Sequence, residues 1–308
     1  MSDPTNAYQS LSETTAQDDP RWAFGTGFTD DVAAEISAPV PAGVDPADLA
    51  AYCLMLGDDA LIYQHRLSEW VANAPELEEE VALANIALDL LGQARVLLSR
   101  AGHLTGVGIK GGSAGSTAAE DRLAYFRVES EFRNVALVEQ PDDLDFGRCI
   151  AHLLLFSTWR LALLHRLVSS ADPVIAAVAA KGVKEVAYHR DYAVRWTLRL
   201  GDGTAESHRR MQAGLDGAWA FLEELFRTSD EERRLVGAGV AVDPAETRAE
   251  VEEVLDQVLT RATLLRPTTR PMGTVGGRGG RQGLHTEKLG PVVDELQSLA
   301  RRFEGATW

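Results

Sequence analysis

The sequence predicts an all-α fold, a bundle of long helices. Helix-forming residues are abundant among its 308 residues, and the alternating pattern typical of β-strands is scarce. Apolar residues recur every three or four positions over segments of 20 residues or more, and short turn signals separate these segments. The first such seam alternates four and three spacing, as in a heptad repeat: Leu49, Cys53, Leu56, Ala60, Tyr63, Leu67 and Trp70.

The predicted helices follow one another along most of the chain. The first opens with Asp45 as N-cap and Pro46 in its first turn. The second, over 75–102, carries glutamates in its first turns, where the helix dipole favours them. Thr117 and Glu120 form a capping box for a shorter helix. Further helices are expected over 145–170, 173–200 and 206–226, from 243 onward and from 291 onward, and Gly-rich stretches at 106–116 and 273–283 are expected to be flexible connections.

Composition divides the chain into two parts. Residues 1–47 hold eight acidic residues against one basic residue and are rich in Pro, Ala, Ser and Thr, which predicts a disordered acidic tail. Residues 48–308 are predicted to form one helical domain.

Charge and patterning also restrict the possible partners. The formal net charge of −16 argues against binding to nucleic acid or to an anionic membrane. No uninterrupted apolar run approaches a membrane span, and the N-terminus lacks the pattern of a signal peptide. We therefore expect a cytoplasmic protein, with Cys53 and Cys149 as small buried hydrophobic residues.

Two of the predicted helices carry a polar stripe on an otherwise apolar surface. In "LANIALDLLGQA" the residues Asn85, Asp89 and Gln93 recur every four positions, which places them on one side of a helix predicted to be buried. The later helix repeats the pattern of a carboxylate between two polar residues with Lys181, Glu185 and His189. One inward carboxylate on each of two long helices is the arrangement of the ferritin-like carboxylate bundles.

The di-iron template of those bundles also needs a histidine three residues after a carboxylate. Gly92 and Tyr188 stand where the ligand histidines are expected, and no Asp-x-x-His or Glu-x-x-His occurs in the chain. The helix over 145–170 supplies no third acid. The stripe is therefore interpreted as a pseudo-metal site that binds no metal and has no catalytic or cofactor-binding residue. Its buried carboxylates are expected to pair with basic or polar groups, at a cost of about 3–5 kcal/mol if Asp89 is removed. The candidate partners are Arg66, Arg95, Arg160, Lys181, Lys184 and His189.

Longer motifs point to a family. "YCLMLGDDALIYQHRLSEWVANAPELEEEVALANIALDLLGQAR", "NVALVEQPDDLDF", "KGVKEVAYHRDYAVRWTLRLGDGT" and "GLHTEKLGP" resemble the PaaC family, over about residues 48–308. These are the non-catalytic, ferritin-like subunits of the bacterial ring 1,2-phenylacetyl-CoA epoxidase. The resemblance implies a heteromeric complex with the catalytic di-iron subunit PaaA, a small subunit and a reductase. That complex uses O2 and NADPH in phenylacetate catabolism, and its iron is expected in the partner subunit.

Two other functions stay open from the sequence. The chain could be a stand-alone ferritin-like, metal-dependent oxidoreductase that uses Asp89, Glu185 and His189. Alternatively, the Gly/Arg loop Gly273–Gly283 could bind the phosphates of a coenzyme A thioester through Arg278 and Arg281. Metal content of the purified chain separates the first alternative from a structural subunit.

Overall fold

The computed structural model describes residues 36–107 and 118–304. The chain divides after Ala38 into two units, and the description below concerns the second unit, which begins at Pro39. The acidic segment 1–35, the Gly-rich stretch 108–116 and Thr117 of the expected capping box lie outside the described residues. Val40 and Val44 already pack against the core, so the packed unit begins nine residues before the predicted boundary at 48.

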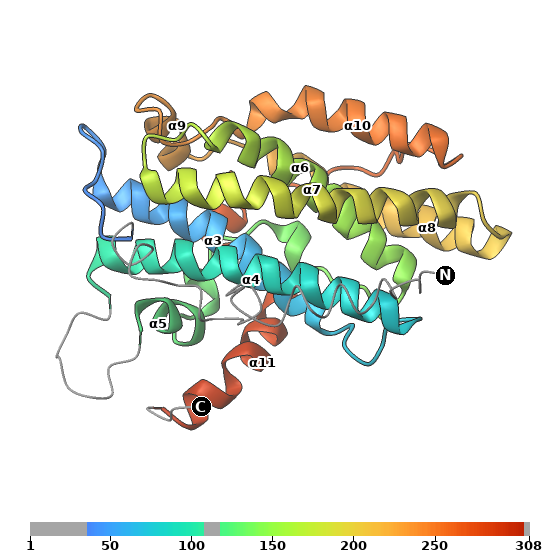
Figure 1. Cartoon of the computed structure of the whole chain (residues 1–308), viewed down its shortest axis with the longest axis horizontal. Helices are drawn as coiled ribbons and strands as arrows, with labels where there is room; N and C mark the ends of the chain where they lie inside the picture. The colour runs from blue at the N-terminus through green and yellow to red at the C-terminus, as the bar shows by residue number, and fades with distance from the viewer. Residues whose placement is uncertain (1–35, 108–117, 305–308) are drawn as a thin grey trace, which may run out of the picture. The chain divides into compact units, whose positions relative to one another are not determined.

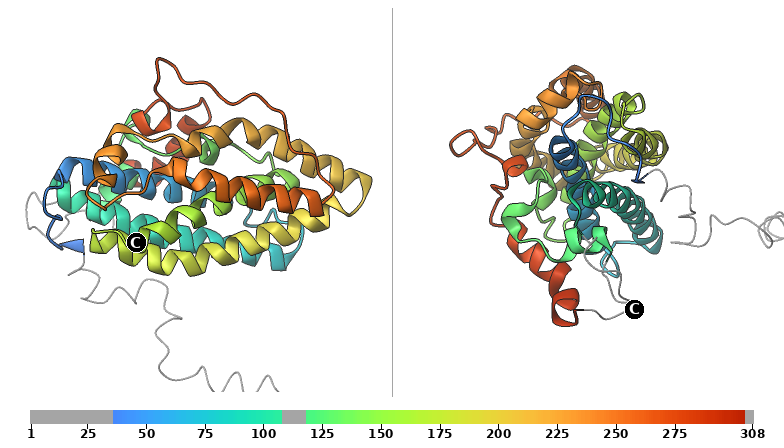
Figure 2. Two further views of the ribbon diagram at one scale, coloured as in Figure 1. Left: turned by 90° about the horizontal axis from the view of Figure 1, so that it is seen from above. Right: turned by 90° about the vertical axis from the view of Figure 1, so that its left-hand side faces the viewer.

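The all-α prediction is confirmed, and the arrangement is that of a ferritin-like bundle. The described residues form no β-strand, and Val275 and Arg278 make an isolated bridge. Figure 1 shows the long helices side by side, and Figure 2 gives the end-on view. The elements are α3 (Pro46–Ser68), α4 (Leu77–Thr105), α5 (Ala119–Tyr125), α6 (Phe146–Leu167), α7 (Pro173–Gly201), α8 (Ala205–Ala218), α9 (Asp230–Val236), α10 (Arg248–Arg261) and α11 (Leu289–Arg302), with 3₁₀ turns η2 (Glu129–Glu131), η3 (Ala136–Glu139), η4 (Trp219–Phe226), η5 (Pro244–Thr247) and η6 (Gly280–Gln282).

Most of the helix starts follow from local capping. Asp45, Asp145 and Asp172 each accept a hydrogen bond from backbone N–H groups of the first turn of α3, α6 and α7. Helix α4 begins at Leu77 and ends at Thr105, and the next residue, Gly106, has a φ of +70°, the usual helix-terminating conformation of glycine. These boundaries lie within a few residues of the predicted ones.

The region after α8 departs from the prediction. The helix expected over 206–226 changes to the 3₁₀ turn η4 at Trp219, and helix α9 follows without having been predicted. The helix expected from Asp243 onward starts with the 3₁₀ turn η5, so α10 begins only at Arg248.

The core centres on α6, which packs against α7, α8 and α10 while α3 pairs with α4. Eighteen of its 22 residues are buried, among them the neighbours Trp159 and Arg160. The apolar helix surrounded by protein is therefore α6. The prediction that α4 is buried nearly all round is wrong, since four of its large apolar side chains are exposed. Both cysteines are free and buried, as expected.

Candidate functional site

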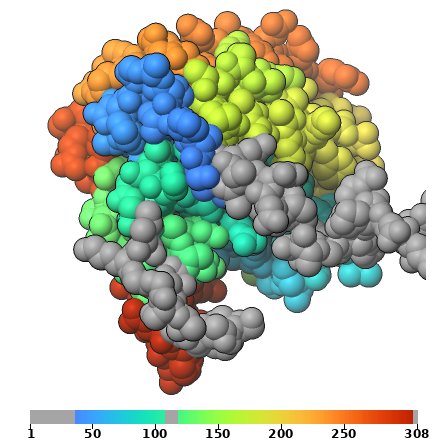
Figure 3. Space-filling view, turned by 60° about the vertical axis from the view of Figure 1, so that its left-hand side comes forward, coloured from blue at the N-terminus to red at the C-terminus, as the bar shows by residue number. Residues whose placement is uncertain are grey.

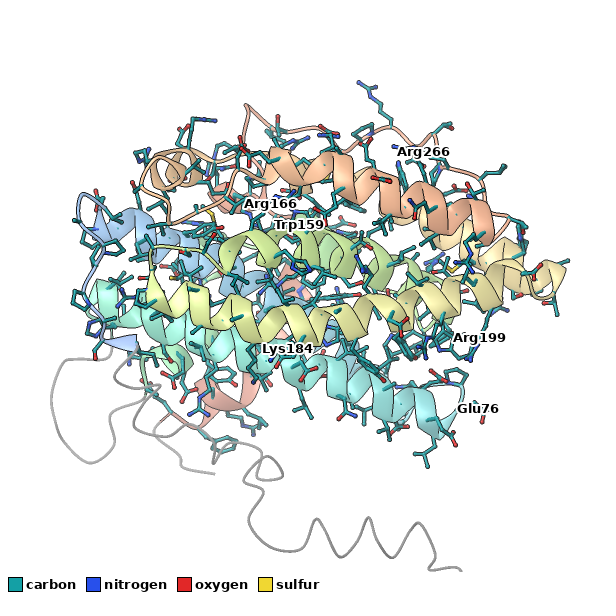
Figure 4. The ribbon with its side chains drawn as sticks, turned by 45° about the horizontal axis from the view of Figure 1, so that its top comes forward. Glu76, Trp159, Arg166, Lys184, Arg199 and Arg266 are labelled. Carbon is teal, nitrogen blue, oxygen red and sulfur yellow. The ribbon has the colours of Figure 1, made fainter. Side chains whose placement is uncertain are left out.

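The polar stripe lies where α4 and α7 pack antiparallel. Residue numbers rise along α4 as their partners' numbers fall along α7. Glu79 accepts hydrogen bonds from Tyr192 and Trp196, and Asp89 Oδ2 lies 3.0 Å from His189 Nε2. Further along, Gln93 Nε2 donates to Glu185 Oε2 at 3.0 Å. Glu76 and Arg199, labelled in Figure 4, mark the end of the bundle at which α4 begins and α7 ends.

Arg160 occupies the point at which the four long helices meet. From α6, its guanidinium donates to Leu56 O of α3 at 3.1 Å and to Gln93 Oε1 of α4 at 3.0 Å. The Gln93 amide in turn donates to Glu185 of α7, whose other oxygen lies 3.2 Å from Lys181 Nζ. Burial lowers the pKa of Arg160 to about 10 and Asp59 opposes that shift, so the guanidinium remains charged at neutral pH. A protein cation thus lies inside the bundle.

The stripe residues have different environments. Gln93 and His189 are buried, whereas Asn85 is exposed and the Asp89 side chain is 37% exposed. Of the six candidate partners, His189 contacts Asp89 and Lys181 contacts Glu185, and Lys184 is exposed. Arg160 reaches the stripe through Gln93, while Arg66 and Arg95 contact Glu69 and Glu120 instead. The expectation that Asp89 is buried is wrong because α4 presents that side partly to solvent.

The positions expected for ligand histidines do not point into the bundle. Gly92 is half-buried and Tyr188 is 54% exposed. A histidine three residues after either carboxylate would therefore face outward. The donors at the centre are a guanidinium, an amide and one carboxylate paired with lysine, which do not fit a di-iron centre. Within 36–107 and 118–304 no group of three or more His, Cys, Asp or Glu side chains could hold a metal ion.

Asp89→Ala should therefore cost about 1 kcal/mol or less, because water can replace a carboxylate that is already more than a third exposed. Gln93→Ala should cost more, about 1–3 kcal/mol, because it leaves Arg160 and Glu185 without their shared amide. Urea unfolding of both variants measures the difference. Equal losses, or a larger loss for Asp89→Ala, would contradict this account of the stripe.

A second group of buried carboxylates lies on α3, where the sequence allows one acid to face inward but does not predict its partners. Asp58 and Asp59, adjacent on α3, both have fully buried side chains. Asp58 accepts from Arg127 Nη1 at 2.9 Å and from the backbone N–H of Arg133. Asp59 accepts from both terminal nitrogens of Arg281, at 3.0 and 2.8 Å, and from the backbone N–H of Val135. These bonds hold the segment 127–135 and the second half of the Gly/Arg loop against α3.

The motif "GLHTEKLGP", further along the chain, also binds a buried carboxylate, that of Glu139. Its His285 Nδ1 lies 2.7 Å from Glu139 Oε1, and Thr286 donates to the other carboxylate oxygen through both its backbone and its hydroxyl group. Asn134 also donates to Glu139, which is fully buried. In the sequence, the motifs that carry the family resemblance were the one signal for this site. No local pattern connects Glu139 with residues about 146 positions away.

The Gly/Arg loop is therefore packed in part rather than a flexible connection. The Arg281 side chain is only 9% exposed, and Asp59 raises its pKa against the opposing effect of burial. Its guanidinium also donates to Met55 O and Arg133 O, so it has little capacity left for a phosphate. A cavity of about 310 Å³ lies against the loop. Its lining includes Glu224, Arg227, Arg233 and Gln282, and Glu224 is bound by the backbone N–H groups of Ala136 and Gly280.

Comparison with known proteins agrees with the motifs. The profile of the family described as "Phenylacetic acid catabolic protein" matches residues 40–308. The chain belongs to this family. It is 43% identical over 260 residues to a subunit of the 1,2-phenylacetyl-CoA epoxidase of Escherichia coli (strain K12). That alignment covers 84% of this chain and 99% of the relative.

As a member of the phenylacetic acid catabolic family, the chain matches the profile almost from the first residue of its packed unit, Pro39. Its helix α4 is long and apolar enough to cross a membrane by length and composition, and fewer than half of the residues in its most apolar window are buried. A single helix of this kind does not by itself indicate a membrane protein. Arg100 of this helix forms a fully buried ion pair with Asp172, at 2.7 Å, which fixes α4 in the bundle.

Proposed function

We propose that this chain is a structural, non-catalytic subunit of a phenylacetyl-CoA 1,2-epoxidase in the cytoplasm. In this role it supports a catalytic di-iron subunit of the PaaA type. A small subunit and a reductase complete an assembly that uses O2 and NADPH to epoxidise the aromatic ring during phenylacetate catabolism. The proposal is supported by the 43% identity to a protein named as a subunit of that epoxidase.

The observation that carries the non-catalytic part is the position of Arg160. Where the four long helices converge, a guanidinium bonded to Leu56 O and Gln93 takes the space between the helices. A cation in that place repels a metal ion, and the remaining donors are too few to hold one. A stand-alone, metal-dependent oxidoreductase is not favoured, because Asp89 and His189 offer one carboxylate and one imidazole at the edge of the bundle.

Co-expression with the catalytic subunit from the same organism tests the proposal. We expect the two chains to co-purify as one complex of defined mass, and oxygen uptake with phenylacetyl-CoA and the reductase to require both chains. After anaerobic iron loading and gel filtration, elemental analysis should find iron with the catalytic subunit and none in stoichiometric amount on this chain alone. Two iron atoms retained per isolated chain would contradict the non-catalytic role, and failure to form any complex would contradict the structural role.

A further inference from the structure

Helix α4 exposes an apolar surface that the described parts of the chain leave uncovered. Its members, called the α4 face below, are spaced four and three residues apart: Leu77, Val81, Ala84, Leu88 and Leu91. The exposed fractions of its four large side chains range from 38% at Leu88 and Leu91 to 70% at Leu77, and Ala84 between them is half-buried. At 1.5 Å per residue the α4 face extends for about 21 Å. Figure 3 shows α4, in cyan to teal, reaching the surface of the molecule.

The fold covers this side of α4 at one end only. Toward the C-terminus of the helix Ser99 and Gly102 are buried, and a Cβ atom built on Gly102 would lie 2.5 Å from Ala119 of α5. From Leu77 to Leu91 no described element covers this side of α4 as α5 covers it near Gly102. A contiguous apolar surface of this kind on a soluble protein usually marks an interaction site.

The border of the α4 face is polar and partly basic. Asp89 and His189 are bonded, so their chain neighbours Leu88 and Tyr188, both exposed, lie on the same side of the molecule. On α7, Lys181 has a side chain that is 75% exposed, and Lys184, labelled in Figure 4, is exposed as well. An apolar centre with an aromatic ring and a charged border is the usual anatomy of a protein interface.

We propose that the α4 face, extended by Tyr188, is the surface that binds the catalytic di-iron subunit. This inference rests on the proposed function, which supplies a helical-bundle partner. Apolar residues spaced four and three apart fit between the side chains of one long helix of such a partner. The partner's apolar stripe should be bordered by acidic residues on the side that meets Lys181 and Lys184.

Two other occupants fit the α4 face less well. A second copy of this chain would bring together two molecules that each carry a net charge of −16. An anionic membrane is disfavoured by the same charge, and the buried Arg100–Asp172 pair prevents α4 from leaving the bundle to enter lipid.

The test compares matched substitutions in the full chain, co-expressed with the affinity-tagged catalytic subunit. Val81→Glu/Leu88→Glu places two charges in the α4 face, while the control Leu265→Glu/Leu299→Glu places two charges at exposed leucines outside it. We expect the α4 variant to weaken the complex by about 100-fold or more, and the control to stay within about threefold of the parent. Leu88→Ala, which adds no charge, should weaken it less, and thermal melts should show that all variants remain folded.

The other possible outcomes distinguish a failure of this inference from a failure of the proposed function. If both double variants bind like the parent, the α4 face is not the interface, although the structural role stands. If the parent itself fails to bind, the proposed function is wrong. Gel filtration of the chain alone overturns the inference if the parent dimerises and Val81→Glu/Leu88→Glu does not. Flotation with phosphatidylglycerol-containing vesicles overturns it if the parent floats and the variant does not.

Discussion

Asp59→Ala is expected to destabilise the chain by about 3–5 kcal/mol. The substitution leaves the Arg281 guanidinium buried and without its bidentate carboxylate. It also removes the acceptor of the Val135 N–H, which is buried next to α3. Urea unfolding followed by circular dichroism measures the loss.

A double replacement tests whether the loss comes from the unpaired charge. Asp59→Leu combined with Arg281→Met removes both ions and should recover part of the stability, because neither ion of the pair is then left buried without the other. Asp191→Ala is the matched control on α7, since Asp191 pairs with Arg195 at the surface and should contribute less than about 1 kcal/mol. A small effect of Asp59→Ala, close to that of Asp191→Ala, would show that Arg281 does not hold the loop.

The long helices could be predicted because their signals are local. Asp45, Asp145 and Asp172 stand directly before apolar-periodic segments, and each caps a helix in the structure. The change at Trp219 from α-helix to the 3₁₀ turn η4 could not be predicted in this way, since the apolar spacing continues through Leu222 to Phe226. Tertiary packing there overrides the local periodicity.

The prediction that the polar stripe of α4 is buried is wrong for a physical reason. Periodicity shows that Leu77, Val81 and Leu88 are apolar positions on a helix, but it does not distinguish a core from an interface with another chain. For this reason α4 was predicted to be buried, and Asp89 with it. In α6 the same kind of pattern does correspond to the core, because α7, α8 and α10 pack against it and Tyr63 of α3 contacts its Phe156 ring.

Some polar contacts of the candidate site could be predicted from the sequence, and others could not. The link between Gln93 and Glu185 was within reach of the sequence, because two stripes of equal spacing on packed helices come together. The bond from Arg281 to Asp59 joins residues 222 positions apart, and its arginine lies in a glycine-rich loop whose composition is typical of a flexible connection. Only the three-dimensional structure could show that this loop returns to α3.

Gly280→Ala should be strongly destabilising, by about 3 kcal/mol, if the second half of the Gly/Arg loop is packed as the structure describes. A Cβ atom at this position would lie 2.0 Å from the backbone oxygen of Asn134, which cannot move without shifting the segment that holds Asp58 and Asp59. The Gly280 N–H, which donates to Glu224 at 3.0 Å, would be displaced as well. Chemical denaturation of the purified variant gives the free energy of unfolding.

Gly273→Ala provides the matched control within the same loop. Apart from its two chain neighbours, no described residue comes within 4 Å of the added methyl group at Gly273, and its φ is outside the left-handed region. That variant should therefore be neutral or more stable by about 0.5 kcal/mol, because alanine restricts the unfolded chain. If Gly280→Ala were as stable as Gly273→Ala, the loop would be a flexible connection after all. The bonds of Arg281 and His285 to α3 and Glu139 would then not hold in solution.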